Sequence, residues 1–139
     1  MTYISAELRQ FIRKRAGKRC EYCLIPDEIS FAAFEIDHII AVKHGGITEE
    51  SNLALSCSLC NKHKGSDIAS LDKDTGKIVG LFHPRKDKWV EHFQLIGSRI
   101  IPLTPVGKVT IQLLQLNSLN RMEERKLLID AGFFKGYSS

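Results

Sequence analysis

The chain of 139 residues is the length of one compact domain with an appendage, and 43% of its residues are hydrophobic while 26% are charged. This balance is typical of a folded protein and excludes an intrinsically disordered chain. No apolar run approaches the roughly 18–20 residues that span a bilayer, and the first residues lack the pattern of a secretory signal. We therefore expect a cytoplasmic protein with no membrane partner.

The first half of the chain predicts a helix, two strands and a second helix. Apolar residues recur at helical spacing after Ser5, which suits a helix N-cap, and Gly17 ends the pattern. Residues 31–42 are rich in β-formers and predict a strand, and residues 52–56 predict another after a glycine turn. Residues 57–65 predict a tight turn that runs into a short helix.

The second half predicts a hairpin and then mainly helices. Residues 71–82 resemble a hairpin with its turn at an Asp-Thr-Gly sequence, and residues 87–93 predict a short helix. A β-segment follows at residues 99–103. Residues 105–116 predict a helix opened by proline, and residues 118–132 predict a last helix whose leucines form core or an interaction face.

The charge distribution is a secondary argument for a nucleic-acid partner. The formal charge is +4, from 20 Lys and Arg against 16 Asp and Glu. Such an excess is compatible with phosphate binding, although a charge run alone is more often a solvated face. The basic clusters are Arg9, Arg13, Lys14, Arg15, Lys18 and Arg19, and then Lys62, Lys64, Arg85, Lys86 and Lys88.

All four cysteines fall into two C-x-x-C pairs, Cys20 with Cys23 and Cys57 with Cys60. Two residues between thiolates let one turn present both sulfurs to the same ion, and two such turns complete the tetrahedron that Zn²⁺ prefers. Disulfides are disfavoured in an intracellular chain, and a redox C-x-x-C would explain one pair but not two. Because cysteine fills all four positions, no site is open for water, and we predict a structural zinc.

Further short motifs lie between the cysteine pairs and just after them. They are Asp37-His38, Gly45-Gly46, Asn52-Leu53, Asn61 and Lys64-Gly65. In this order, and framed by the cysteines, the set resembles the HNH endonucleases, whose core is a ββα-metal motif often clamped by a four-cysteine zinc. The resemblance covers residues 20–65, about a third of the chain.

The resemblance implies an α+β fold built on a ββα-metal (His-Me finger) core clamped by the four-cysteine zinc. It assigns residues 1–66 to the nuclease core with an N-terminal helix. Residues 67–139 then form a C-terminal α/β extension, which we expect to pack on the core as one compact unit.

Phosphodiester cleavage needs a base that activates water and a cation that stabilises the charge on phosphate. His38 is the candidate base, because imidazole accepts a proton near neutral pH, and Asp37 offers a hard oxygen ligand for Mg²⁺ or Mn²⁺. Neighbours in a strand point to opposite faces, so the phosphate would sit between them at the strand's end. By resemblance, Asn52 is the middle asparagine, which holds a loop and orients the histidine through backbone hydrogen bonds.

The family normally has histidine directly after the last cysteine, where this chain has Asn61. The chain therefore resembles an H-N-N variant, in which the Asn61 carbonyl still offers the catalytic metal an oxygen and favours Mg²⁺ over a softer ion. His63 is an alternative ligand, ranked lower because helix geometry turns it about 200° away from Asn61. Glu35 either assists at the metal site or faces solvent.

The main hypothesis is a metal-dependent endonuclease that hydrolyses phosphodiester bonds in DNA, with double-stranded DNA as the first choice of partner. We expect Lys62, Lys64, Arg85 and Lys86 to contact phosphates. The alternative is a catalytically inactive zinc-containing module that binds nucleic acid, and a third reading is a protein-interaction adaptor. An acid beside a base at residues 37–38 argues against a pure binder, which needs neither. Target specificity and oligomeric state stay open.

Overall fold

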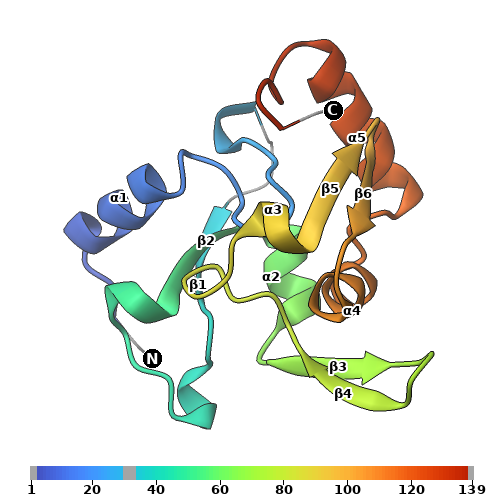
Figure 1. The fold of residues 1–139 in the computed structure, drawn as a ribbon. Coiled ribbons are helices and arrows are strands. Elements are labelled where there is room, and N and C mark those ends of the chain that lie inside the picture. Colours follow the sequence, from blue (N-terminus) through green and yellow to red (C-terminus); the bar gives the residue numbers. More distant parts are fainter. Residues whose placement is uncertain (1–2, 30–33, 138–139) are drawn as a thin grey trace. The chain divides into compact units, whose positions relative to one another are not determined.

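A computed structural model describes residues 3–29 and 34–137 of the chain. These residues form α-helices and three antiparallel sheets of two strands each, which confirms the predicted α+β class (Figure 1). The chain divides into two compact units. Unit 1 holds the residues up to Ile68 together with His83–Asp87, and unit 2 holds Ala69–Phe82 together with the residues from Lys88 onwards. The expected packing of a C-terminal extension on the core as one unit stays a prediction.

The first helix, α1 (Ala6–Arg15), lies where the sequence predicts it. Ser5 caps it, because its side-chain oxygen accepts a hydrogen bond from the Leu8 amide at 3.1 Å. Basic residues gather in the last turn, where they complement the helix dipole. The chain leaves the helix through Gly17, whose φ of +66° is a conformation that glycine adopts readily.

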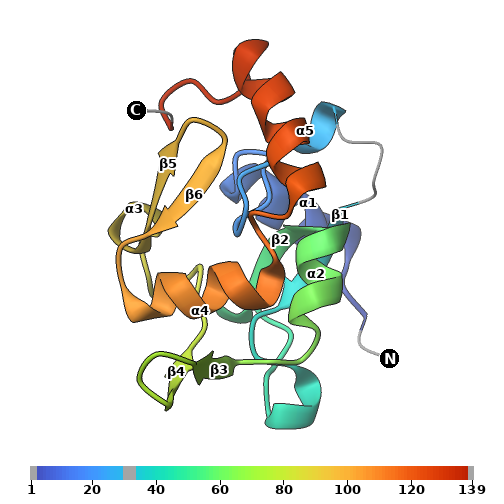
Figure 2. The same cartoon turned by 90° about the vertical axis from the view of Figure 1, so that its right-hand side faces the viewer.

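Two strands and a helix form the centre of unit 1. β1 (Phe34–His38) and β2 (Leu53–Cys57) pair antiparallel, with Asp37 opposite Ala54. α2 (Ser58–Lys64) follows β2 directly and packs against both strands (Figure 2). The order of these elements is the ββα arrangement that the sequence predicts. Short 3-10 helices at Asp27–Ile29, Val42–His44 and Glu50–Asn52 complete the unit.

The predicted strand at residues 31–42 is too long. β1 ends at His38, and the first three residues of the predicted strand lie outside the described part of the chain. Beyond His38 the Ile39 amide still donates to the Asn52 carbonyl oxygen at 2.8 Å, but the Ile40 amide donates to the side-chain atom Asn52 Oδ1 at 2.9 Å. A side-chain hydrogen bond therefore shapes a stretch that strand propensity alone would extend.

The two faces of β1 have different surroundings. Phe34 and Ile36 pack into an apolar cluster between α1 and β2. The buried members of this cluster are Ile4, Ile12, Leu53 and Leu55. Because side chains alternate along a strand, Glu35 and Asp37 point to the other face, where they contact residues of α2. One face of β1 thus stabilises the unit while the other carries its polar groups.

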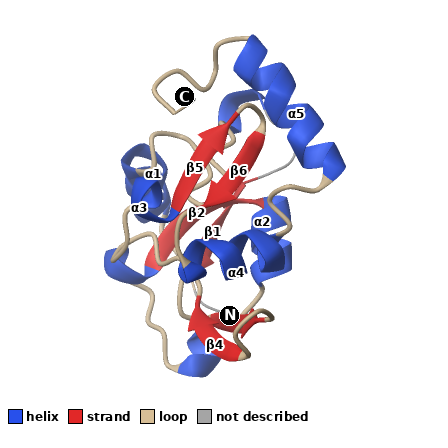
Figure 3. Cartoon of the chain, turned by 45° about the vertical axis from the view of Figure 1, so that its right-hand side comes forward, coloured by secondary structure: helices blue, strands red, loops and turns tan. Residues whose placement is uncertain are grey.

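Unit 2 contains two hairpins with α4 packed against strands of both (Figure 3). Its elements are β3 (Ala69–Asp72), β4 (Lys77–Gly80), α3 (Trp89–His92), β5 (Phe93–Ile96), β6 (Arg99–Pro102), α4 (Pro105–Leu114) and α5 (Leu119–Asp130). Thr104 caps α4 by accepting a hydrogen bond from the Gly107 amide at 3.1 Å. None of the described helices is long and apolar enough to cross a bilayer.

The sequence predicts every element of unit 2 except β5. Phe93, expected at the end of a short helix, begins this strand instead. Phe93 is buried, and its ring centroid lies 5.3 Å from the ring centroid of Phe82 and 5.0 Å from that of Trp89. Phe93 therefore forms core, as the sequence predicts, and the half-buried Trp89 packs against it.

Candidate functional site

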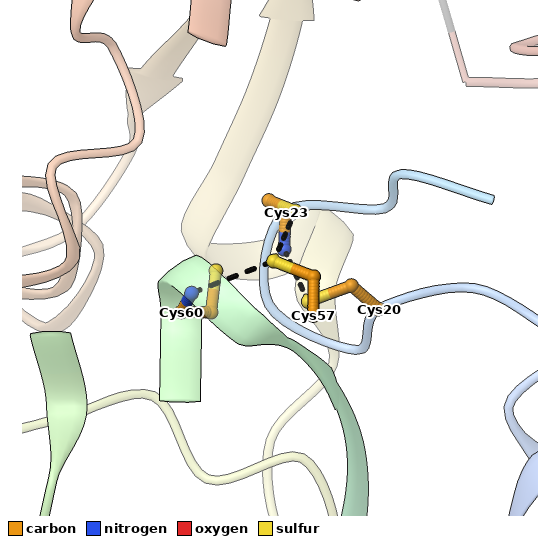
Figure 4. Close-up of side chains that lie close together, drawn as sticks. All are labelled: Cys20, Cys23, Cys57 and Cys60. Carbon is orange, nitrogen blue, oxygen red and sulfur yellow. Dashed lines mark hydrogen bonds between the residues drawn. The ribbon is translucent and has the colours of Figure 1, made fainter. Parts of the chain in front are cut away.

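The four cysteines meet at one point of unit 1. Cys20 and Cys23 come from the loop after α1, while Cys57 ends β2 and Cys60 lies in the first turn of α2 (Figure 4). All four are buried, and their sulfur atoms lie within 4.8 Å of one another. Cys23 Sγ and Cys57 Sγ are 3.7 Å apart, close to the edge of about 3.8 Å expected for a tetrahedron with Zn–S bonds of about 2.3 Å. The predicted cluster is confirmed, and its donor set fits a closed structural zinc.

The two cysteine turns are built alike. The Cys23 amide donates to Cys20 Sγ at 3.5 Å, and the Cys60 amide donates to Cys57 Sγ at 3.4 Å. Burial raises the pKa of the Cys20 and Cys60 thiols well above the ordinary range. Thiolates in such a place need a cation beside them, which is a second reason why the cluster fits a metal.

Polar residues of β1 and α2 pair across the face opposite the apolar cluster. Asn61 Nδ2 donates to Glu35 Oε2, and Lys64 Nζ lies 3.3 Å from Asp37 Oδ1 and 3.2 Å from Asp37 Oδ2. Residues two apart in a strand and three apart in a helix each share a face. Glu35 and Asp37 of β1 therefore contact Asn61 and Lys64 of α2, respectively.

Asp37 is 4% exposed and held from two sides. Besides its ion pair with Lys64, it accepts a hydrogen bond from the Tyr22 hydroxyl, whose oxygen is 2.7 Å from Oδ2. Burial raises the pKa of Asp37, whereas the charge of Lys64 and the hydrogen bond of Tyr22 oppose this shift. A carboxylate offers about four lone-pair positions, so Oδ1, with its single contact to Lys64, keeps acceptor capacity.

His38 ends β1 and is half-buried. Its Nε2 lies 2.9 Å from Thr48 Oγ1. With the ring proton on Nε2, the imidazole donates to Thr48 and its Nδ1 stays available to accept a proton.

The chain between β1 and β2, residues 39–52, is pinned by the Asn52 amide. Asn52 Oδ1 accepts from the Ile40 amide, and Asn52 Nδ2 donates to the carbonyl oxygens of Ile40 and Ile47, each at 2.9 Å. Gly46 is required here, since a Cβ at this position would lie 1.7 Å from the Ile40 carbonyl oxygen. This loop also carries Thr48, so Asn52 holds the backbone from which the hydroxyl reaches His38.

The structure brings some of the expected site residues together and separates others. Asp37 and Asn61 lie on the face shared by β1 and α2, next to Glu35, while His38 ends the same strand. Of the expected phosphate contacts, Lys62 and Lys86 are exposed. Lys64 is 2% exposed and faces Asp37 rather than solvent.

The loop His83–Asp87 belongs to unit 1, where Arg85 forms an ion pair with Glu21. Glu21 in turn accepts from the Leu55 amide at 2.8 Å and donates its own amide to the Leu55 carbonyl oxygen at 2.9 Å. Burial lowers the pKa of Arg85 to about 10, still far above neutrality. The guanidinium therefore fastens the loop beside β2, and the contact of Arg85 with phosphate stays a prediction.

We expect His83 to make the stability of unit 1 depend on pH. Its Nδ1 accepts hydrogen bonds from the amides of Arg85 and Lys86, both at 3.2 Å, and a protonated ring would lose this acceptor. Burial lowers the pKa of His83, as do the charges of Lys86 and Lys64, while Asp87 raises it. The unfolded chain thus binds a proton near pH 6.5 before the folded chain does, so folding stability is lost as pH falls below this value.

We expect His83→Gln to flatten part of the decline in unfolding free energy between pH 7.5 and pH 5. Urea unfolding at a series of pH values measures it, and His44→Gln, at an exposed histidine, is the matched control. A decline in His83→Gln as steep as that of the unchanged protein contradicts the assignment.

Sequence reasoning missed two members of this site. Tyr22 could have been noticed as the one aromatic residue inside a C-x-x-C pair. Thr48 carries no signal, because its contact with His38 depends on the path of the whole loop.

Residues 20–67 match the family model described as HNH endonuclease. The match contains both cysteine pairs together with β1, β2 and α2. No curated protein and no solved structure is significantly similar to the chain. The resemblance predicted from the short motifs is thus confirmed over this segment, and the four-cysteine cluster is consistent with a zinc-containing member.

Proposed function

Because residues 20–67 match the HNH endonuclease family model, we propose that the chain is a metal-dependent endonuclease that hydrolyses phosphodiester bonds in DNA. The observation that carries the proposal is the placement of an acid, a base and an amide on adjoining elements. Asp37 and His38 end β1, and Asn61 lies opposite on α2. The four-cysteine site lies outside this set and, in the proposal, holds a Zn²⁺ that only fixes the fold.

In this proposal His38 is the general base. Its Nε2–H is held by Thr48, and Nδ1 takes a proton from the attacking water. The Asn52 amide keeps the loop of Thr48 in place and so orients the ring indirectly.

Asp37 and Asn61 would hold the catalytic cation. Asn61 Nδ2 donates to Glu35, which leaves the side-chain oxygen Asn61 Oδ1 to face a cation, and Asp37 Oδ1 keeps acceptor capacity. Carboxylate and amide oxygens suit Mg²⁺ or Mn²⁺. A divalent cation bound here supplies stabilisation of the charge on the phosphate and the departing oxygen. Lys62 and Lys86, which are exposed, are the proposed contacts to DNA phosphates.

We expect His38→Ala to lower the cleavage rate by about 10²- to 10⁴-fold, the usual contribution of a general base. The measurement is conversion of supercoiled plasmid to nicked and linear forms, and of single-stranded DNA to fragments, with Mg²⁺, Mn²⁺ or EDTA. Thr48→Val should fall between His38→Ala and the unchanged protein, because the ring loses its hydrogen bond but not its basicity. His44→Ala, at an exposed histidine outside the site, is the matched control.

Two results would count against the proposal. Cleavage by His38→Ala at the rate of the unchanged protein overturns the assigned base. Binding of DNA without cleavage, with either metal and on every substrate, favours instead a catalytically inactive zinc-containing module, for which the formal charge of +4 is the supporting observation.

A further inference from the structure

A buried polar cluster joins the two cysteine turns to the proposed reaction site. Its members are Tyr22, Asp37 and Lys64, which are 1%, 4% and 2% exposed. Tyr22 lies between Cys20 and Cys23, and Lys64 lies four residues after Cys60 on α2. The turn of Cys20 and Cys23 therefore provides one of the two groups that hold the Asp37 carboxylate, and the helix that begins with Cys60 in its first turn provides the other.

Lys64 also holds the backbone at the end of β1. Its Nζ lies 3.3 Å from the His38 carbonyl oxygen and 3.0 Å from the Ile39 carbonyl oxygen, besides its contact with Asp37. An ammonium has three N–H donors, and these acceptors use all of them. Lys64 thus fixes, through one cation, the carboxylate of Asp37 and the point at which His38 leaves the sheet.

Folding stability alone gives little reason to bury this pair. Removing a carboxylate and an ammonium from water is costly, and apolar residues of similar volume often stabilise a protein as well or better. In the proposed reaction site, the Asp37 carboxylate and the His38 backbone both need a fixed position, and Lys64 contacts both of them.

We propose that Tyr22 and Lys64 are positioning residues of the nuclease site, which couple the four-cysteine site to Asp37 and His38. This inference rests on the proposed endonuclease function. Neither side chain needs to touch substrate, because each acts through Asp37 or through the backbone of His38. Their loss should therefore change turnover and metal affinity rather than the affinity for DNA.

Tyr22→Phe is the first test, because it removes the hydroxyl and keeps the ring. We expect kcat to fall 10- to 100-fold and Mn²⁺ to bind more weakly by a similar factor, as is usual when a residue supporting a metal ligand is lost. KM for DNA and the absorption spectrum of the Co²⁺-substituted four-cysteine site should stay unchanged. Tyr3→Phe, at a tyrosine that is 81% exposed, is the matched control.

Lys64→Met is the second test, with Lys73→Met, at an exposed lysine of unit 2, as its control. Calorimetric titration with Mn²⁺ measures metal affinity in both proteins, and a weaker affinity only in Lys64→Met supports the inference.

The outcomes separate the inference from the proposed function. If the unchanged protein cleaves DNA and Tyr22→Phe matches it in kcat and Mn²⁺ affinity, the inference is overturned while the function stands. An altered Co²⁺ spectrum accompanying the loss of activity also overturns it, since Tyr22 would then be a structural residue of the cysteine site. If the unchanged protein cleaves nothing, the proposed function fails, and Mn²⁺ affinity alone decides whether Tyr22 and Lys64 position Asp37.

Discussion

Removing zinc from the four-cysteine site with a chelator is expected to unfold the segment that carries β1, β2 and α2. The site joins residues 20–23 to residues 57–60, and the apolar cluster between α1 and β2 has four buried members in the described part of unit 1. A structural zinc contributes on the order of 10–16 kcal/mol in small zinc-binding domains. Whole domains are stable by only about 5–15 kcal/mol, so the metal-free chain has no reserve to replace that contribution.

Circular dichroism measures the loss of folded structure as the chelator is added, and a zinc indicator measures the metal released. Restoring Zn²⁺ or Co²⁺ should recover the folded signal, while Mg²⁺ should not, because thiolates select the softer ions. Cys57→Ser, which replaces one sulfur ligand, should behave like the chelated protein. An unchanged melting temperature after complete metal removal contradicts the structural role.

The fold of unit 1 follows from patterns that are local in the sequence. Each C-x-x-C turn is complete within four residues, so spacing alone predicts that Cys57 and Cys60 face one ion. The helix after Ser5 and the order of two strands and α2 are likewise predicted, because capping residues and β-formers act over short distances.

The surroundings of the charged residues could not be predicted in the same way. Lys64 was expected on the surface, but α2 begins at Ser58, and its helical period turns Lys64 to the same side as Asn61, toward β1. Arg85 lies far along the chain from Glu21, so their ion pair depends on the tertiary path of the loop His83–Asp87. Composition shows that a residue is basic but not which carboxylate it meets.

The last helix shows the same limit in unit 2. The leucines in and before it were expected to form core or an interaction face; Leu116 is fully buried, whereas Leu119 and Leu127 are 67% and 71% exposed and remain candidates for an interaction face. The buried residues of α5 include Arg121 and Arg125, which donate to the carbonyl oxygens of Leu114 and Leu116 at 2.8 and 2.7 Å. The end of a helix leaves carbonyl groups unpaired, and apolar periodicity does not reveal that arginines will satisfy them.

Lys64→Met is expected to lower the free energy of unfolding by about 3–5 kcal/mol, because it leaves the buried Asp37 carboxylate without its cation. Chemical denaturation of the zinc-loaded protein measures the loss. Lys73→Met should change the value by no more than about 0.5 kcal/mol, as is usual for an exposed site.

Adding Asp37→Asn to Lys64→Met separates stability from function. The double variant should recover most of the lost stability, since no buried charge is left unpaired and the Tyr22 hydroxyl still has an oxygen acceptor. Cleavage should stay low, because neither the carboxylate nor the cation that positions it is present. If the free energy of unfolding of Lys64→Met equals that of Lys73→Met, the buried pair contributes nothing to folding. Recovery of cleavage in the double variant would show instead that an amide suffices at residue 37, and that Lys64 is needed only to neutralise a carboxylate.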